Sequence, residues 1–152
     1  GMGPFSPERA GALPSSGILD LVFESNRDRA SIEDLLSKES GLKGYLGTTD
    51  LQEVEERIHR GDSEAELIFQ AMVYQICKEI AAMASVLKFE LDGILLTGGM
   101  ANSQLLCSSI SQRVQALAEI FVEPGENEME ALAQAGLRIL SGAEPVKLYT
   151  QN

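Results

Sequence analysis

The order of apolar segments after residue 90 constrains the fold most strongly, because it reads strand, helix, strand, helix. The expected elements are strands over 91–97 and 120–123, a helix over about 103–117, and a last helix that begins at Glu126 or Asn127 and ends at Leu140. Two strands joined by one helix are expected to lie parallel and adjacent, through a right-handed crossover. A lone pair of strands is marginally stable, so either helices cover it or further strands come from a missing segment or a partner chain.

Capping patterns predict four helices before these strands. The expected N-caps are Ser15 or Ser16 for a helix through Phe23, Ser31 with Asp34 for one ending near Gly41, Thr49 with Gln52 for one ending near Arg60, and Ser63 with Glu66 for the longest, which reaches Leu87. The glycine-rich stretch 41–47 is expected to separate the second helix from the third. The opening segment 1–11 holds two prolines and three glycines, so we expect a shaped loop or a disordered lead.

The longest of these helices is expected to lie at the centre of the fold. Its apolar residues recur at three- and four-residue steps and also occupy other faces. Phe69, Met72, Tyr74 and Met83 are expected in the core or in a dimer contact. We expect no membrane span, because this segment also carries charged residues.

Length, charge and cysteine content narrow the class of protein. A chain of 152 residues with 44% hydrophobic content is long enough for one domain with a core. Its formal net charge of -11 repels phosphate backbones and anionic membranes, so neither nucleic acid nor a membrane is expected as a partner. Cys77 and Cys107 lie far apart without CxxC spacing, which favours packed, reduced thiols in a cytoplasmic protein, with a disulfide as the alternative.

Gly98 and Gly99 lie between an apolar strand and the start of a helix. Glycine has no Cβ atom, so a ligand can lie close to the backbone, and the following helix presents unpaired N–H groups. Asn102 and Ser103 are residue types that cap helices. The junction is therefore a candidate nucleotide site, although a tight turn without any ligand explains the same residues.

Four segments, in the same order along the chain, resemble those of butyrate kinases. They are residues 3–11, 44–50, 96–99 and 124–132. Butyrate kinases belong to the acetokinase family, within the superfamily of acetate and sugar kinases, actin and chaperone ATPases. The resemblance covers essentially the whole chain and corresponds to the C-terminal portion of such an enzyme.

This resemblance implies an α/β fold, the helix-rich C-terminal part of an actin-like, ribonuclease H-like ATPase domain. Few strands are expected because the first strands of that domain are missing, so residues 1–152 would form a single partial domain. The implied activity is phosphoryl transfer between ATP and a short-chain carboxylate, giving ADP and an acyl phosphate. Positive groups and a magnesium ion are needed to neutralise charge on the moving phosphoryl group.

The resemblance also implies roles for particular residues. Arg9 corresponds to an arginine that contacts the transferring group and the carboxylate, and Glu128 to a glutamate near Mg²⁺. The implied nucleoside contacts are Thr48, Thr49, Asp50 and Gln52 in one segment and Gly98, Gly99 and Asn102 in the other. Gln52 departs from the family, which commonly has an arginine there, so a cationic contact is lost. The phosphate-binding loops and several catalytic residues of the family precede the region that this sequence matches.

Several of these residues also have purely structural interpretations. Arg9 could be a surface charge, and Glu128 could interact only with the helix dipole, with Glu126 and Glu130 as rivals for a metal role. His59 is expected to cap a helix C-terminus at the surface. A solvated helix face without a metal cluster is expected for Glu53, Glu55 and Glu56.

Two functional hypotheses follow. In the first, the chain is the C-terminal part of a butyrate-kinase-like carboxylate kinase, retains the nucleoside contacts and is inactive alone. In the second, it is a stand-alone remnant that dimerises or binds nucleotide without catalysis. A homodimer is expected in either case.

Overall fold

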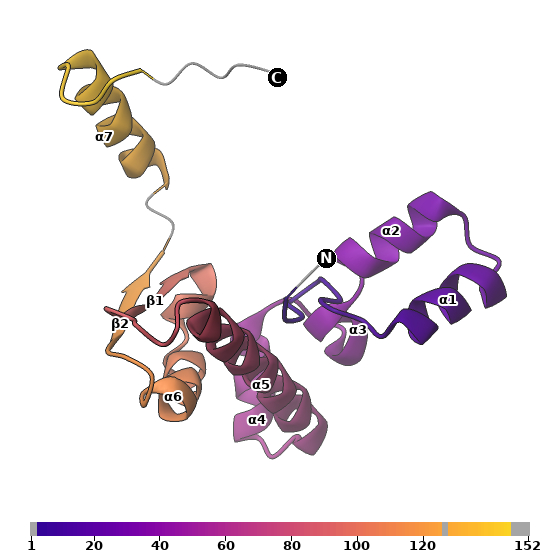
Figure 1. The fold of residues 1–152 in the computed structure, drawn as a ribbon. Helices are drawn as coiled ribbons and strands as arrows, with labels where there is room; N and C mark the ends of the chain where they lie inside the picture. Colours follow the sequence, from indigo (N-terminus) through magenta and orange to yellow (C-terminus); the bar gives the residue numbers. More distant parts are fainter. Residues whose placement is uncertain (1–2, 126–127, 147–152) are drawn as a thin grey trace.

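The computed structural model describes residues 3–125 and 128–146, apart from the side chain of Glu128. Over these residues the chain forms a helix-rich α/β fold with two strands, as predicted (Figure 1). In chain order the elements are α1 (Ser15–Glu24), α2 (Arg29–Lys38), α3 (Gly41–Leu46), α4 (Leu51–His59), α5 (Ser63–Val86), β1 (Ile94–Gly98), the 3-10 helix η1 (Gly99–Asn102), α6 (Gln104–Val114), β2 (Ile120–Pro124) and α7 (Glu128–Leu140).

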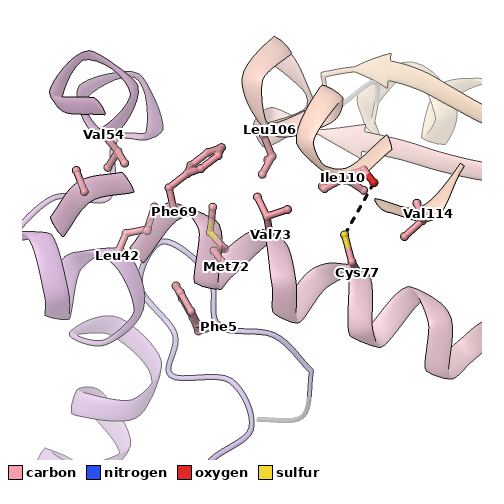
Figure 2. Close-up of a cluster of buried hydrophobic side chains, with 11 residues drawn as sticks. Phe5, Leu42, Val54, Phe69, Met72, Val73, Cys77, Leu106, Ile110 and Val114 are labelled. Atoms are coloured by element: carbon pink, nitrogen blue, oxygen red, sulfur yellow. Dashed lines mark hydrogen bonds between the residues drawn. The ribbon is translucent and has the colours of Figure 1, made fainter. Parts of the chain in front are cut away.

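The core lies around α5, between α3 and α4 on one side and α6 on the other. Figure 2 shows that Phe69 and Met72 of α5 point toward α3, α4 and the N-terminal loop. Val73 and Cys77 of the same helix point toward α6. The buried cluster consists of Phe5, Leu42, Val54, Ala65, Phe69, Met72, Val73, Cys77, Leu106, Ile110 and Val114. The burial of Phe69 and Met72 agrees with the sequence, whereas Tyr74 and Met83 are exposed and contribute little to this core.

Helix α5 is the one described helix that is long and apolar enough to cross a membrane by length and composition. Core helices of globular proteins meet the same criterion. Six residues of α5 are buried against neighbouring elements: Ala65, Phe69, Met72, Val73, Cys77 and Ala84. Those contacts account for its apolar character as the central helix of this fold.

The two strands pair in parallel, as predicted, with Ile94 opposite Ile120 and Gly98 opposite Pro124. Residues of β1 alternate between half-buried and exposed, so Ile94 and Leu96 face the core while Leu95 faces outward. The first strand begins at Ile94 rather than at residue 91. Residues 91–93 fall outside the ladder, which opens where the Ile94 N–H donates to the Glu119 carbonyl at 2.8 Å.

Aspartates cap three of the helices where the sequence predicted serine or threonine. Asp28 accepts from the Ser31 N–H, Asp50 from the Gln52 N–H, and Asp62 from the N–H groups of Glu64 and Ala65. The expected caps Ser31, Thr49 and Ser63 were therefore wrong, as were Ser15 and Ser16, since α1 follows Pro14 without a side-chain cap. Asp50 and Asp62 adjoin the expected caps, and Asp28 lies three residues before Ser31. Each aspartate supplies the same kind of acceptor with a full negative charge, which the positive end of the helix dipole favours.

A short helix, α3, occupies the stretch 41–47 that was predicted as a break. Leu42 is fully buried, and the Arg57 guanidinium donates to the Leu46 carbonyl at 2.9 Å. Arg57 also pairs with Asp62 at 2.8 Å, so it joins the ends of α3 and α4 to the start of α5. These tertiary contacts outweigh the low helix propensity of glycine.

The N-terminal segment is a shaped loop held by α3. The N–H groups of Leu42 and Lys43 donate to the carbonyls of Ser6 and Pro7 at 3.2 and 2.8 Å. A Cβ atom at Gly41 would lie 1.9 Å from the Ser6 carbonyl oxygen, so the loop approaches as closely as it does because residue 41 is glycine. Phe5 anchors the loop in the core.

Three helices contribute almost nothing to the core. Helices α1 and α2 have no buried residues, and no described side chain of α7 is buried. Figure 1 shows α7 set apart from α4, α5 and α6, beyond the strands. Its exposed apolar side chains include Met129, Leu132, Leu137 and Leu140. The expected start of this helix at Glu126 or Asn127 lies outside the described residues.

Candidate functional site

The first wall of the candidate site is the turn after β1. Gly98 has φ 84° and ψ -179°, a backbone conformation that is essentially restricted to glycine. The chain then forms η1, in which the Asn102 side-chain amide donates to the Gly99 carbonyl at 2.8 Å. Ser103 caps α6, because its hydroxyl accepts from the Leu106 N–H at 2.9 Å. These local hydrogen bonds define the shape of the turn.

The second wall is the start of α4. The Thr48 hydroxyl accepts from the Asp50 N–H at 3.1 Å, and the Asp50 carboxylate in turn accepts from the Gln52 N–H at 2.9 Å. These local bonds fix the segment 48–52 where the chain leaves α3. Val54, two residues further along, is fully buried and holds α4 against the core.

A cavity of about 730 Å³ lies between these two walls, and we call it the α4–η1 cavity. It brings together two segments that are about 50 residues apart in the sequence, each of which the sequence had indicated. Five predicted contacts line it: Thr49, Asp50, Gln52, Gly99 and Asn102. Thr48 and Gly98 are the immediate neighbours of lining residues. The other lining residues, which the prediction did not include, are Pro7, Leu51, Glu55, Met100, Ser103 and Gln104.

Glu55 is the most informative residue that the sequence analysis missed. We expected it on a solvated face with Glu53 and Glu56, and those two are exposed, but Glu55 is half-buried. Its carboxylate accepts a hydrogen bond from the Ser103 hydroxyl. The interaction joins α4 to the cap of α6 and so connects the two walls. Its position four residues after Leu51, on the same helix face as that half-buried side chain, was the available signal.

A second cavity of about 870 Å³ adjoins the first and shares Glu55, Asn102 and Gln104 with it. His59 and Cys107 contribute to its other walls. His59 is exposed and its Nδ1 lies 2.7 Å from the Glu55 carbonyl oxygen, which agrees with the expected surface position near the end of α4.

The charges of the α4–η1 cavity limit what it can bind. Asp50 and Glu55 are the charged side chains among the described residues that line it, and neither lysine nor arginine is among them. A phosphate group would meet carboxylates there, whereas hydroxyl or amino groups could donate hydrogen bonds to them. The cavity therefore suits an uncharged polar group such as a nucleoside better than a phosphate.

Arg9, one of the two predicted catalytic residues, does not line this cavity. Arg9 is exposed, in the loop that contributes Pro7 to the cavity wall, and it is not itself a lining residue. Glu128 begins α7, and its side chain lies outside the described part of the chain. Within that part, no group of three or more His, Cys, Asp or Glu side chains is placed to hold a metal ion.

Both cysteines are free and buried, as predicted. Burial raises the pKa of the Cys77 thiol and also that of the Cys107 thiol. The Cys77 thiol donates weakly to the Ile110 carbonyl across the interface between α5 and α6 (Figure 2). Raised pKa values make both thiols poor nucleophiles, so their role is packing.

Comparison with known proteins finds one matching family and a similar full-length relative. Residues 3–147 match the Acetokinase family. A probable butyrate kinase from Listeria welshimeri is 43% identical over 149 residues, a match that covers 98% of this chain and 42% of the relative. The chain thus spans about two fifths of the length of that relative.

Solved structures of acetate and propionate kinases share the fold. The acetate kinase of Porphyromonas gingivalis superposes with a TM-score of 0.82 at 22% identity, over 91% of this chain and 41% of that one. The acetate kinase of Entamoeba histolytica superposes with a TM-score of 0.79 at 16% identity, over 91% of this chain and 43% of that one. A propionate kinase of Francisella tularensis superposes with a TM-score of 0.71 at 21% identity, over 84% of this chain and 39% of that one.

Proposed function

Since this chain belongs to the acetokinase family, we propose that it is the nucleoside-binding part of a butyrate-kinase-like carboxylate kinase. The reaction would be phosphoryl transfer between ATP and a short-chain carboxylate, with ADP and an acyl phosphate as products. The observation that carries this proposal is the convergence of Thr49, Asp50, Gln52, Gly99 and Asn102 on the α4–η1 cavity.

Each wall of the cavity would make a different kind of contact with the nucleoside. Gly99 leaves its backbone open, since no atom lies within 4 Å of the position a Cβ would occupy. A flat base or a ribose could approach there closely. The carboxylates of Asp50 and Glu55 would accept hydrogen bonds from hydroxyl or amino groups, and the Gln52 and Asn102 amides can both donate and accept.

The phosphoryl-transfer step would need groups beyond this cavity. Bound Mg²⁺ neutralises charge on the phosphates in such a reaction, and arginine stabilises the moving phosphoryl group. We propose Arg9 for the second role and Glu128 as a contributor to the magnesium site, each completed by residues from the rest of a longer protein. The chain spans 42% of its butyrate kinase relative, so we expect it to be inactive alone and to form a single partial domain over 1–152.

A second candidate function is a stand-alone module that dimerises or binds nucleotide without catalysis. Exposed apolar side chains on α5, such as Leu67 and Tyr74, favour a homodimer. The free, buried thiols favour the cytoplasm. Sedimentation equilibrium tests the dimer, with twice the 16.4 kDa chain mass expected and the single-chain mass contradicting it.

Two assays test the main proposal. Hydroxylamine captures acyl phosphates, so the chain with ATP, Mg²⁺ and butyrate should yield no hydroxamate, and clear turnover would contradict its being only part of the enzyme. Calorimetry with ADP should show saturable binding. Absence of binding at millimolar ADP would indicate that Gly98 and Gly99 form a turn that does not bind nucleotide.

A matched pair of variants locates that binding. Asn102→Ala removes a cavity wall and the bond to Gly99, so we expect ADP affinity to fall about fivefold, the value of one hydrogen bond. Gln134→Ala on α7 also removes an exposed side-chain amide and its hydrogen bond, but lies outside the cavity. Its ADP affinity should equal that of the unaltered chain, and equal losses in the two variants would place the site elsewhere.

A further inference from the structure

Arg9 lies in a loop whose backbone is tied to two helix ends. The Ala10 N–H donates to the Leu36 carbonyl in the last turn of α2, at 2.9 Å. The Ser40 N–H, at the N-cap of α3, donates to the Glu8 carbonyl at 2.9 Å. Carbonyls in the last turn of a helix and N–H groups at its start have no partners inside the helix. The loop supplies partners here, so the residues on both sides of Arg9 are fixed.

Ser6 closes a turn around Arg9 with two hydrogen bonds. Its N–H donates to the Arg9 carbonyl at 3.1 Å, and its hydroxyl accepts from the Arg9 N–H at 3.1 Å. Pro7, which lies between them, has its φ angle restricted by the proline ring. A Cβ atom at Gly41 would lie 3.0 Å from the Arg9 carbonyl oxygen, so the start of α3 packs directly against the turn. Both polar backbone groups of Arg9 therefore have a partner in Ser6.

The Arg9 side chain remains available for a ligand. It is exposed, and it forms no ion pair with another described residue. Pro7 lines the α4–η1 cavity, so the turn that carries Arg9 also forms part of the cavity wall. Groups that stabilise a moving phosphoryl group are most effective when their positions are fixed before the reaction. A guanidinium on an anchored backbone has only its side-chain rotamers left to order.

We infer that Ser6 is a positioning residue for Arg9. Its two hydrogen bonds hold the Arg9 backbone beside the α4–η1 cavity, so that the guanidinium can meet the phosphoryl group of a bound nucleotide. The inference rests on the proposed role of Arg9 in phosphoryl transfer. It also gives α2 a task, because α2 has no buried residues, yet its Leu36 carbonyl fixes the loop next to Arg9.

The first experiment measures the order parameter of the Arg9 N–H in the chain itself, by nitrogen-15 relaxation. The unaltered chain should give about 0.85, the value of rigid backbone, and Ser6→Ala should lower it by at least about 0.1. Ser6→Thr keeps the hydroxyl and should keep the rigid value. Ser37→Ala is the control, because it removes an exposed hydroxyl that bonds only to the Glu33 carbonyl within α2. A smaller change in Ser6→Ala, or an equal change in Ser37→Ala, would contradict the inference.

The second experiment measures catalysis in a fusion of this chain to the part of the Listeria welshimeri relative that precedes its matched region. Ser6→Ala should lower kcat about tenfold, because it misplaces Arg9, and should leave KM for ATP within about twofold. Ser6→Thr should restore kcat, and a raised KM with unchanged kcat in Ser6→Ala would contradict positioning.

The two experiments separate the inference from the proposal on which it rests. An unchanged kcat in Arg9→Ala would overturn the proposed role of Arg9 in phosphoryl transfer. An unchanged order parameter in Ser6→Ala would overturn the positioning by Ser6 and leave the role of Arg9 intact. Because the order parameter is measured on the chain alone, it decides the positioning whatever the activity of the fusion.

Discussion

The region around α4, α5 and α6 differs sharply from the surfaces that surround it. In the first region, buried side chains pack α4 and α6 against α5, and the α4–η1 cavity lies between these packed elements. The outlying α1 and α7 have large apolar side chains exposed to solvent, α2 has no buried residue, and β1 pairs on one edge only among the described residues. The candidate cavity thus lies in the packed region, whereas the surrounding helices leave apolar groups exposed.

Core truncation should separate the two regions most strongly. Phe69 on α5 is 1% exposed and Phe23 on α1 is 80% exposed. Phe69→Ala should lower the free energy of unfolding by about 3–5 kcal/mol, because it loses burial and leaves a cavity. Phe23→Ala should change it by less than about 0.5 kcal/mol. Urea denaturation followed by circular dichroism measures both, and comparable losses would show that α1 is packed as firmly as α5.

The two glycines of the turn should respond differently to alanine. Gly98→Ala forces an unfavourable backbone conformation and should cost about 1–3 kcal/mol of stability as well as ADP affinity. Gly99 has no positive φ and open space around it, so Gly99→Ala should leave stability within about 0.5 kcal/mol. Its methyl group should still weaken ADP binding. Unchanged ADP binding in Gly99→Ala would show that the ligand does not approach this backbone.

The hydrogen bond between Glu55 and Ser103 should couple the two walls of the cavity. Ser103→Ala should weaken ADP binding about fivefold, and Glu55→Ala should weaken it more, because it also removes a carboxylate that faces the nucleoside. The double variant should be no worse than Glu55→Ala alone, since both changes break the same hydrogen bond. Glu53→Ala is the control on the exposed face of α4 and should bind normally. Additive losses in the double variant would mean that the two residues act separately. Calorimetry of the four proteins gives the answer.

The smallest expected effect concerns the aspartate caps. Hydrogen bonds from the Ala65 N–H and from Arg57 lower the pKa of Asp62 below its ordinary 3.8, and those from Ser31 lower the pKa of Asp28. A lowered pKa in the folded state stabilises the protein above pH 3.8 and loses this effect as the pH falls through the folded value. Asn also caps helices, so Asp62→Asn should remove mainly the pH-dependent part of stability.

Asp28→Asn at the start of α2 is the matched comparison for Asp62→Asn at the start of α5. Asp28→Asn should alter the acid transition of global unfolding less, because α2 has no buried residues to couple it to the core. Thermal unfolding measured between pH 3 and 6 compares the two variants. A larger shift for Asp28→Asn would contradict the division into a firm core and outlying helices.

The sequence predicted most of the helices, the parallel strands and both segments of the cavity, because helical spacing and the glycine pair are local signals. It missed α3, because the burial of Leu42 and the bond from Arg57 to Leu46 are tertiary contacts that outweigh the glycines of that stretch. It also misassigned Glu55, whose environment depends on Ser103, 48 residues away. Serine or threonine caps were predicted at positions 31, 49 and 63, whereas Asp28, Asp50 and Asp62 cap these helices, because a residue pattern does not resolve which of several nearby acceptors is the cap.

The central claim is that this chain carries the nucleoside side of the site without the groups that hold phosphates. Calorimetric titration with adenosine and with ADP, in parallel and without metal, tests it directly. The lining residues include carboxylates and neither lysine nor arginine, so the two ligands should bind with affinities within about threefold of each other. ADP binding more than tenfold tighter than adenosine, or no binding of either at millimolar concentration, would contradict the account.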